Sequence, residues 1–193
     1  MINLEEKMNL VEPIRSKEKI ELFKSELRKT GERNYLIFLF GINVGLRISD
    51  ILNLKVKDII SPYGTMNTHI ELKEKKTKKV KRFKINPILA EELKQYVSYM
   101  DYNDYLFKSR NGENQPLTRV QAYRILNNVA KKLNLEKIGT HTLRKTFGYH
   151  FYKQNHDIAT LQKLFNHSSM YVTLRYIGIT QDTLDDALDT FSL

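Results

Sequence analysis

The chain has 193 residues, of which 41% are hydrophobic, and this length supports one domain with a sizeable core. Its 32 Lys and Arg residues outnumber its 22 Asp and Glu residues, and the resulting net charge of +10 suits a polyanionic partner better than a small acidic substrate. The absence of cysteine excludes disulfides and thiolate-bound zinc. The N-terminal segment MINLEEKMNL is not a signal peptide, and the apolar stretch at 35–42 is too short to span a bilayer, so we expect a soluble, cytoplasmic protein.

Two helices are predicted at the start of the domain. Residues 1–15 are expected to be a lead-in, after which Ser16 can cap a helix that runs to about residue 29. Gly31 would end that helix. A second helix over about 32–45 is apolar almost all the way round, which predicts that it lies at the buried centre of the domain.

The segment 55–86 is predicted to be a β insertion. Three short strands, at 56–60, 69–72 and 80–85, are separated by turn signals and would form a small sheet with a basic hairpin. Eight of the twelve residues from 73 to 84 are Lys or Arg. Most such runs are solvated surface, and we expect this of about half of these residues, but a basic hairpin is also suited to lie along a DNA groove and neutralise phosphates. The candidates for DNA contacts are Lys73, Lys75, Lys78, Lys79, Lys81 and Arg82.

The remainder of the chain is predicted to be mostly helical. A polar loop is expected at 107–116, and the stretch at 168–179 is interpreted as a short connection. The segment at 180–193 has apolar residues at helical spacing and aspartates on its other side, which predicts a C-terminal helix. Helices are expected to begin at Pro87, Thr118, Thr140, Asp157 and Thr180.

Six residues scattered along the chain would together make a metal-free site for attacking a phosphodiester. Three cationic side chains could hold the phosphate and leaving-group oxygens, two imidazoles could move protons, and one phenol could be the nucleophile. Singly, each has an ordinary explanation, such as a surface arginine, a hydrogen-bonded core histidine or one of 11 tyrosines. The six residues are Arg47, Lys76, His141, Arg144, His167 and Tyr176.

The segments that carry these residues resemble the successive motif boxes of the catalytic domain of tyrosine recombinases, the integrase family. The boxes are GLRISDILNLKVKDI, KKTKKVKRFKI, HTLRKTFGYHFYK and LQKLFNHSSMYVTLRYIGI, in the order and at the spacing of the family, and the resemblance covers about residues 10–190. With the predicted elements it implies a mainly α (α+β) fold with a small three-stranded antiparallel sheet. That fold is also similar to the catalytic core of type IB topoisomerases.

The resemblance implies that Tyr176 is the nucleophile and that Arg47 and Arg144 clamp the phosphate. Two guanidiniums would stabilise the phenolate and the extra negative charge of the pentacoordinate transition state. Attack would give a 3′-phosphotyrosine and a free 5′-hydroxyl, and a 5′-hydroxyl from another strand could then reverse the step and exchange strands. This chemistry needs no metal and no other cofactor.

The resemblance also implies roles for the two histidines and for a lysine. His141 would accept or relay the tyrosine proton, and His167 would hydrogen-bond the phosphate. Lys76 is the best match for the lysine that protonates the leaving oxygen, with Lys75 as a close neighbour. One departure is Asn166, which stands where the family usually has glycine, and asparagine also tolerates left-handed backbone angles.

We therefore expect a site-specific DNA recombinase whose catalytic domain spans 16–179. The implied partners are double-stranded DNA, further copies of the chain in a tetramer on DNA, and accessory DNA-bending proteins. The helix at 180–193 would either pack on its own core or dock on a neighbouring protomer. The chain could be a fragment of a larger recombinase or a minimal member of the family. Two alternatives stay open: a catalytically silent DNA-binding regulator, and a type IB topoisomerase-like enzyme that relaxes DNA.

Overall fold

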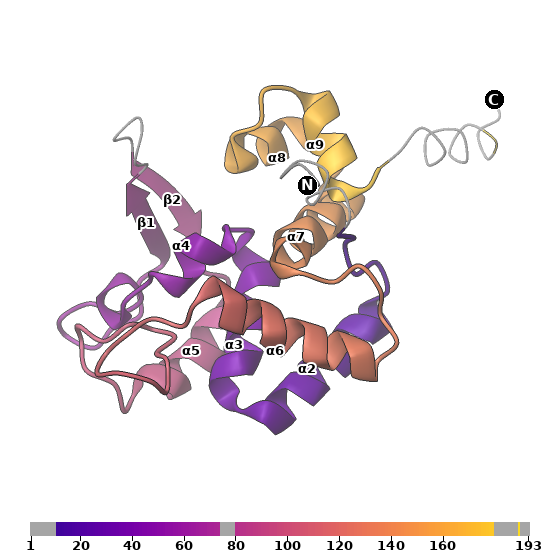
Figure 1. Cartoon of the computed structure of the whole chain (residues 1–193). Coiled ribbons are helices and arrows are strands. Elements are labelled where there is room, and N and C mark those ends of the chain that lie inside the picture. The colour runs from indigo at the N-terminus through magenta and orange to yellow at the C-terminus, as the bar shows by residue number, and fades with distance from the viewer. Residues whose placement is uncertain (1–10, 74–79, 180–188, 190–193) are drawn as a thin grey trace.

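The computed structural model describes residues 11–73, 80–179 and 189 (Figure 1). These residues form a mainly helical fold with one small antiparallel sheet, β1–β2. The elements are α2 (Lys17–Thr30), α3 (Glu32–Val44), α4 (Ile48–Leu52), the 3-10 helix η1 (Val56–Asp58), β1 (His69–Lys73), β2 (Val80–Lys84), α5 (Pro87–Val97), α6 (Arg119–Lys132), α7 (Thr140–Asn155), α8 (Ile158–Phe165) and α9 (Met170–Ile177).

Helix α3 lies at the centre of the main core, as its apolar sequence predicts. It contacts α2, α4, α5 and α7, and nine of its 13 residues are buried. The preceding helix, α2, begins and ends where the sequence predicts. The Ser16 side chain accepts a hydrogen bond from the Lys19 amide at its start, and Gly31 separates it from α3. Phe23 of α2 stacks on Phe38 of α3 with 4.7 Å between ring centroids. These contacts confirm the two predicted N-terminal helices.

Glycines let α7 approach α3 closely. A side-chain carbon at Gly41 would lie 2.6 Å from Cδ1 of Leu143, which is closer than carbon atoms can pack. Gly45 ends α3 with a φ of 69°, in the left-handed region that favours glycine, and it faces the ring of Phe147. The chain therefore turns sharply at the point where α3 meets α7, two residues before Arg47.

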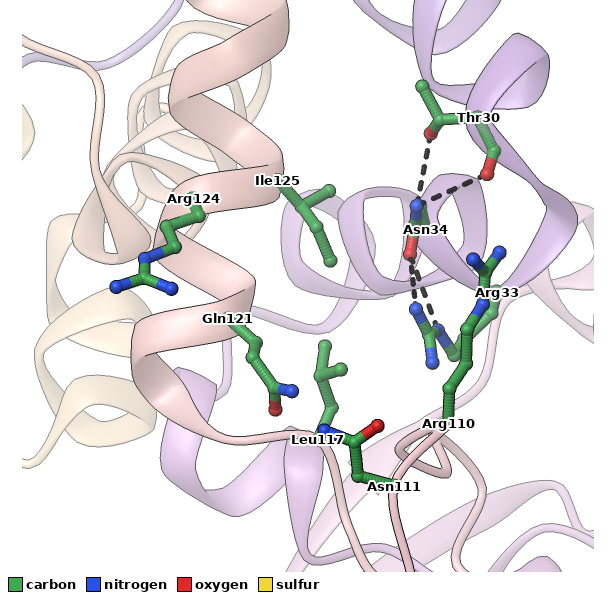
Figure 2. Close-up of a pocket in the computed structure, with 9 residues that line it drawn as sticks. All are labelled: Thr30, Arg33, Asn34, Arg110, Asn111, Leu117, Gln121, Arg124 and Ile125. Atoms are coloured by element: carbon green, nitrogen blue, oxygen red, sulfur yellow. Dashed lines mark hydrogen bonds between the residues drawn. The ribbon is translucent and has the colours of Figure 1, made fainter.

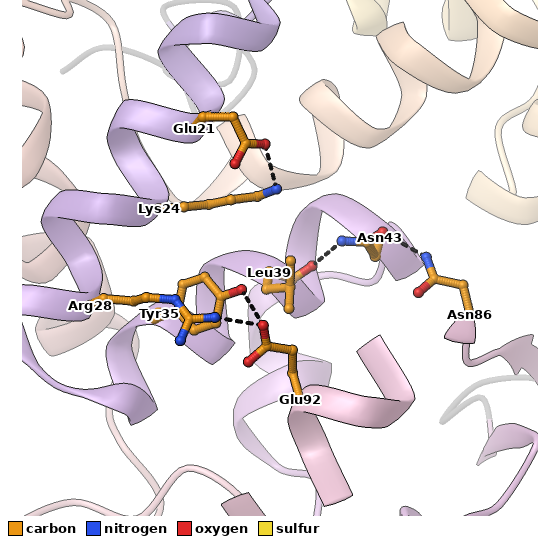
Figure 3. Close-up of polar contacts among 8 residues, drawn as sticks. All are labelled: Glu21, Lys24, Arg28, Tyr35, Leu39, Asn43, Asn86 and Glu92. Carbon is orange, nitrogen blue, oxygen red and sulfur yellow. Dashed lines mark hydrogen bonds and ion pairs between the residues drawn. The ribbon is translucent and has the colours of Figure 1, made fainter. Parts of the chain in front are cut away.

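Helices α2, α3 and α5 are also joined by a polar cluster (Figure 3). The guanidinium of Arg28 lies 3.7 Å from the centroid of the Tyr35 ring, and its Nη2 donates to Oε1 of Glu92 over 2.5 Å. The hydroxyl of Tyr35 donates to the same carboxylate oxygen over 3.0 Å. Burial raises the pKa of Tyr35, so this hydroxyl stays protonated and remains a donor at neutral pH.

A second polar contact ties the end of the hairpin to α3 (Figure 3). Asn86, which follows β2, donates through Nδ2 to Oδ1 of Asn43 over 2.6 Å, and its own Oδ1 accepts from the Leu89 amide at the start of α5. Asn43 in turn donates to the carbonyl oxygen of Leu39 within α3. The base of the hairpin is therefore held beside the end of α3 from which Arg47 follows.

The prediction of a three-stranded sheet is wrong at its first strand. Residues 56–58 form the 3-10 helix η1, and Ile60 makes only an isolated bridge with Met66. The apolar residues Val56, Ile59 and Ile60 follow i, i+3, i+4 spacing, which places them on one side of a helical turn rather than on alternate faces of a strand. The carboxylate of Asp58 stabilises the turn by accepting from the Lys55 amide over 2.8 Å.

The two remaining strands form the predicted hairpin with a definite register. Ile70 pairs with Phe83, and both side chains are buried on the core-facing side. Because antiparallel partners share a face and successive residues alternate, the pairs Glu71–Arg82 and Lys73–Val80 lie on the opposite, outer face.

The interpretation of 168–179 as a connection is also wrong, because most of it is helix α9. Ser169 caps this helix by accepting from the Val172 amide over 3.2 Å, and Gly178 ends it with a φ of 79°. Helices α8 and α9 contact each other and α7, and they lie together at one end of the molecule (Figure 1). They form a small second core around Leu161, Phe165 and Ile177.

The other predicted helices are confirmed, with one shift. The helix that begins at Pro87 ends at Val97, three residues before the expected end at Met100. The predicted C-terminal helix at 180–193 lies outside the described residues, apart from Asp189. No helix within the described ranges is long and apolar enough to cross a membrane.

The segment that precedes α2 is fastened to α7 and to the end of α9. Nζ of Lys145 donates to the carbonyl oxygen of Val11 over 2.7 Å, and the Ile14 amide donates to Oγ1 of Thr146 over 2.9 Å. Nη2 of Arg15 donates to the carbonyl oxygen of Gly178 over 3.1 Å. Part of the expected lead-in therefore belongs to the folded body.

Candidate active site

The structure brings five of the six predicted catalytic residues together, where α7, α9 and the start of α4 meet. His141 and Arg144 lie on the first two turns of α7, as their spacing predicts. Arg47 precedes α4, while His167 and Tyr176 come from the α8–α9 region. The sixth, Lys76, lies outside the described residues, and so does its neighbour Lys75.

Arg144 is the most firmly held of these side chains. It is only 5% exposed; its Nη1 donates to the carbonyl oxygen of Gly45 over 2.6 Å, and its Nη2 donates to that of Phe165 over 2.9 Å. The guanidinium also stacks 4.0 Å from the centroid of the Phe165 ring. Burial lowers the pKa of Arg144 to about 10, and the charge of Arg47 adds to this lowering. The group is still protonated at neutral pH, so it places a fixed positive charge inside the site.

Arg47 is the exposed counterpart of Arg144. It occupies the position just before α4 in an extended conformation, with φ −69° and ψ 144°. Its positive charge contributes to the lowered pKa values of Arg144 and His167 and opposes the rise in the pKa of Tyr176. One buried and one exposed guanidinium therefore face the same region.

Tyr176 lies on α9, next to both histidines. Its hydroxyl oxygen is 3.5 Å from Nδ1 of His141, and its ring centroid is 5.0 Å from that of His167. Nζ of Lys145 lies 5.4 Å from the centroid of the tyrosine ring. Burial raises the pKa of Tyr176, while the charges of Arg144 and Arg47 oppose that rise.

Both histidines are neutral at physiological pH. Burial lowers the pKa of His141, and the positive charges of Arg119 and Arg144 lower it further. Burial lowers the pKa of His167 to about 4, again with help from Arg144 and Arg47. A neutral imidazole can accept a proton, which a protonated one cannot do.

Asn166 fulfils the backbone requirement expected at this position. It ends α8 in the left-handed conformation, with φ 55° and ψ 46°. Its amide donates to the carbonyl oxygen of Lys163, and the next amide, of His167, donates to that of Gln162. The turn that aims His167 towards Tyr176 is therefore built without the glycine that the family usually has.

The described residues of the basic hairpin divide between its two faces. Lys73 and Arg82 lie on the outer face, where Nε of Arg82 pairs with Oε1 of Glu71 over 3.2 Å. Lys81 lies opposite Leu72 on the other face. The remaining candidates for DNA contacts, Lys75, Lys78 and Lys79, lie outside the described residues.

A basic pocket that the sequence reasoning missed lies between α3, α6 and the 107–116 loop (Figure 2). It has a volume of about 380 Å³, and Arg33, Arg110 and Arg124 are among its lining residues. The side chains of Arg33 and Arg110 lie next to each other, and the charge of Arg110 contributes to a lowered pKa of Arg33, although burial is the larger cause. No hydrogen bond or carboxylate pairs with Arg110 among the residues that the structure describes. These arginines are far apart in the sequence, so no local pattern could have indicated the pocket.

Two arginines, two neutral histidines and a tyrosine thus lie close together in a mainly helical domain. The family to which the chain belongs is the phage integrase family, the tyrosine recombinases, because its residues 14–182 match the model described as "Phage integrase family". Tyrosine recombinases catalyse the breakage and rejoining of DNA.

Among curated proteins, the chain is similar to the "Probable integrase/recombinase YoeC" of Bacillus subtilis (strain 168). The two are 50% identical over 184 residues, which cover 95% of this chain and 98% of YoeC. The chain is also 29% identical to the tyrosine recombinase XerA of Pyrococcus furiosus, over 92% of this chain and 61% of XerA. It thus spans nearly all of one relative and under two thirds of the other.

Solved structures of recombinases share the fold. A XerH site-specific recombinase bound to a palindromic difH substrate, in a post-cleavage complex, matches with a TM-score of 0.72 and 25% identity, over 94% of this chain and 53% of that one. The catalytic domain of bacteriophage HP1 integrase matches with a TM-score of 0.63 and 21% identity, over 93% of this chain and 95% of that one. The mainly helical fold with a small sheet is therefore that of the tyrosine recombinase catalytic domain.

Proposed function

We propose that this tyrosine recombinase is a site-specific enzyme that cleaves double-stranded DNA with Tyr176 and rejoins it through a 3′-phosphotyrosine. The observation that carries the proposal is the position of the Tyr176 hydroxyl, 3.5 Å from Nδ1 of His141 and within the electrostatic reach of Arg144 and Arg47. Tyrosine is a weak nucleophile at neutral pH, so its neighbours have to supply the activation.

The two arginines would hold the scissile phosphate in different ways. Arg144 uses one donor on each terminal nitrogen to bind a backbone carbonyl oxygen, which fixes its plane and leaves its other N–H groups for the phosphate. Arg47 is exposed and adds a second positive charge two residues after Gly45, whose carbonyl oxygen binds Arg144. Fixed charges of this kind stabilise the extra negative charge of the pentacoordinate transition state.

The proton of the phenol would pass to His141. That imidazole is neutral, and its Nδ1 lies 3.5 Å from the Tyr176 hydroxyl oxygen. As the bond between the tyrosine oxygen and phosphorus forms, the bond from phosphorus to the 5′ oxygen breaks. Lys76 is proposed, from its place in the hairpin sequence, to protonate that leaving oxygen. In the reverse reaction a 5′-hydroxyl attacks the phosphotyrosine and releases Tyr176.

The proposed DNA contacts extend beyond the cleavage site. A phosphate-binding surface is supported by the net charge of +10, by Lys73 and Arg82 on the outer face, and by Arg110, which has no partner in the part of the chain that the structure describes. Assembly of four copies on DNA, docking of residues 180–193 on a neighbouring copy and help from DNA-bending proteins remain predictions, as does the division of the chain at residues 16 and 180.

Two alternative functions differ in what the site would have to do. A catalytically silent DNA-binding regulator has no need for a tyrosine placed beside a neutral histidine and two arginines. A type IB topoisomerase-like enzyme would use the same residues but would relax DNA of arbitrary sequence without exchanging strands. The similarity to YoeC over nearly the whole length of both proteins supports the recombinase.

The test is covalent trapping on nicked duplexes tiled across the DNA that flanks the gene. The wild type is expected to form a covalent adduct on one of these duplexes, and Tyr176→Phe is expected to bind it with equal affinity and form none. An adduct with Tyr176→Phe would show that another residue is the nucleophile. Binding without an adduct by the wild type would favour the regulator, and relaxation of unrelated supercoiled plasmid without joined products would favour the topoisomerase.

A further inference from the structure

Thr173 is a completely buried polar residue next to the proposed site. It lies on α9, one turn before Tyr176, and its side chain has no exposed surface. Its Oγ1 has two hydrogen-bond partners, the carbonyl oxygen of Ser169 at 3.0 Å and Nδ1 of His167 at 3.2 Å. Neither the charge of the site nor the proposed chemistry requires a threonine at this position.

The direction of these two hydrogen bonds follows from counting protons. A hydroxyl has one proton to donate, and a carbonyl oxygen can only accept. The Thr173 proton is therefore directed to Ser169, which leaves the Thr173 oxygen as an acceptor towards His167. Nδ1 of His167 has to be the donor in that contact, so it carries a proton. In a neutral imidazole the other nitrogen, Nε2, then has a free lone pair.

We propose that Thr173 is a positioning residue that holds the neutral His167 as its Nδ1–H tautomer and keeps Nε2 unprotonated. Its catalytic part rests on the function proposed above, whereas the tautomer is a property of the free protein. The contact with Thr173 also fixes the plane of the imidazole ring, which packs edge to face on both Phe165 and Tyr176.

The fixed tautomer determines what His167 can do in the free site. An unprotonated Nε2 accepts a hydrogen bond but cannot donate one to a phosphate oxygen, so the hydrogen bond expected between His167 and the phosphate requires Nε2 to take up a proton first. The free enzyme therefore presents two cationic donors, Arg144 and Arg47, and a histidine that is ready to receive a proton. With the opposite tautomer, Nε2 would carry the proton, and the nitrogen that accepts, Nδ1, would face Thr173.

The direct test is nitrogen-15 NMR of the histidine rings in the DNA-free protein at pH 7. The chain has 5 histidines, and a His167→Gln variant identifies the signals of His167 by their loss. The wild type and Thr173→Ser, which keeps the hydroxyl, are expected to show the Nδ1–H tautomer. Thr173→Val, which keeps the shape but has no hydroxyl, is expected to show a mixture of both tautomers.

A matched control separates the tautomer from the general loss of a buried hydroxyl. Thr146 is also buried, and its Oγ1 accepts from the Ile14 amide without contacting His167. Thr146→Val is expected to leave the His167 signals unchanged. An Nε2–H tautomer in the wild type, or an unchanged tautomer in Thr173→Val, would overturn the proposal.

Covalent trapping then measures the catalytic consequence. Thr173→Val is expected to lower the rate of adduct formation by on the order of tenfold, with Thr173→Ser restoring most of it. A loss of stability in Thr173→Val without a change of tautomer would assign Thr173 a purely structural role. If the wild type forms no adduct while the tautomer result holds, the proposed function fails and the assignment of the tautomer stands.

Discussion

The hydroxyl oxygen of Tyr176 lies 3.5 Å from Nδ1 of His141, at the outer limit of a hydrogen bond. The pKa of the tyrosine is raised by burial and that of the histidine is lowered by burial, so both groups are neutral in the free protein. A neutral pair at this distance has little tendency to transfer a proton. Closer approach in the DNA complex and the charges of the arginines would make that transfer favourable, so we infer that the free site is assembled but not activated.

The two arginines are expected to respond differently to substitution by lysine. Arg144→Lys loses the hydrogen bonds to the Gly45 and Phe165 carbonyl oxygens, so the unfolding free energy should fall by about 2 kcal/mol. Arg47→Lys changes an exposed residue, and its stability should stay within about 0.5 kcal/mol of the wild type. Both variants should form the covalent adduct on the order of 100-fold more slowly, because lysine lacks the planar fork.

Urea denaturation and adduct trapping measure these two effects separately. Equal losses of stability in the two variants would contradict the structural role assigned to Arg144. A fully active Arg47→Lys would contradict the proposed clamp.

The depressed pKa of His167 predicts that the protein loses stability in mild acid. This pKa is about 4 in the folded protein, mainly because of burial and also because of Arg144 and Arg47, while an unfolded histidine titrates near 6.5. Between these values the unfolded chain binds more protons than the folded one, so stability falls as the pH falls from about 6.5 towards 4. Partial exposure reduces the expected loss to about 1 to 2 kcal/mol between pH 7 and pH 5.

The comparison variant for this experiment is His167→Gln, which cannot titrate. Its unfolding free energy in urea should change less than that of the wild type over the same pH range. The lowered pKa of His141 acts in the same direction in both proteins, so it cancels in the comparison. Parallel pH curves for the two proteins would show that His167 has an ordinary pKa.

Arg110 is expected to contact a DNA phosphate. Arg110→Ala should weaken binding similarly for different sequences and reduce the slope of log affinity against log salt by about one. Lys24→Ala is a suitable control because it removes the same charge, but Lys24 is already paired with Glu21 over 2.7 Å (Figure 3). Fluorescence anisotropy across a salt series measures both. An unchanged slope for Arg110→Ala, or an equal decrease for Lys24→Ala, would place the DNA elsewhere.

Local signals in the sequence predict most of the helices, because each depends on a few neighbouring residues. Ser16, Thr118 and Asp157 cap helices by accepting from backbone amides three residues later, as expected. Helix α9 was missed although Ser169 caps it in the same way. With only eight residues, this helix is too short to show a clear helical period in the sequence.

The remaining differences depend on contacts that only the folded chain makes. The segment 56–60 has three apolar residues, as a short strand would, and only their i, i+3, i+4 spacing distinguishes a helical turn from a strand. The pocket around Arg33 and Arg110 joins residues that are 77 positions apart in the sequence. Likewise, the contact between Thr173 and His167 depends on how α9 packs, although both residues lie within one motif.

Gly41 and Gly45 have no side chains, and this allows α3 and α7 to pack closely beside the site. Leu143 and Phe147 of α7 fill the volume that any side chain at these two positions would need. Arg144 lies between those two residues on α7, and Arg47 follows Gly45 by two positions. The separation of the two guanidiniums is therefore set partly by these two glycines, of which Gly45 also accepts a hydrogen bond from Arg144. A methyl group at either glycine would push α3 and α7 apart and would increase the distance between the two guanidiniums that have to bind one phosphate.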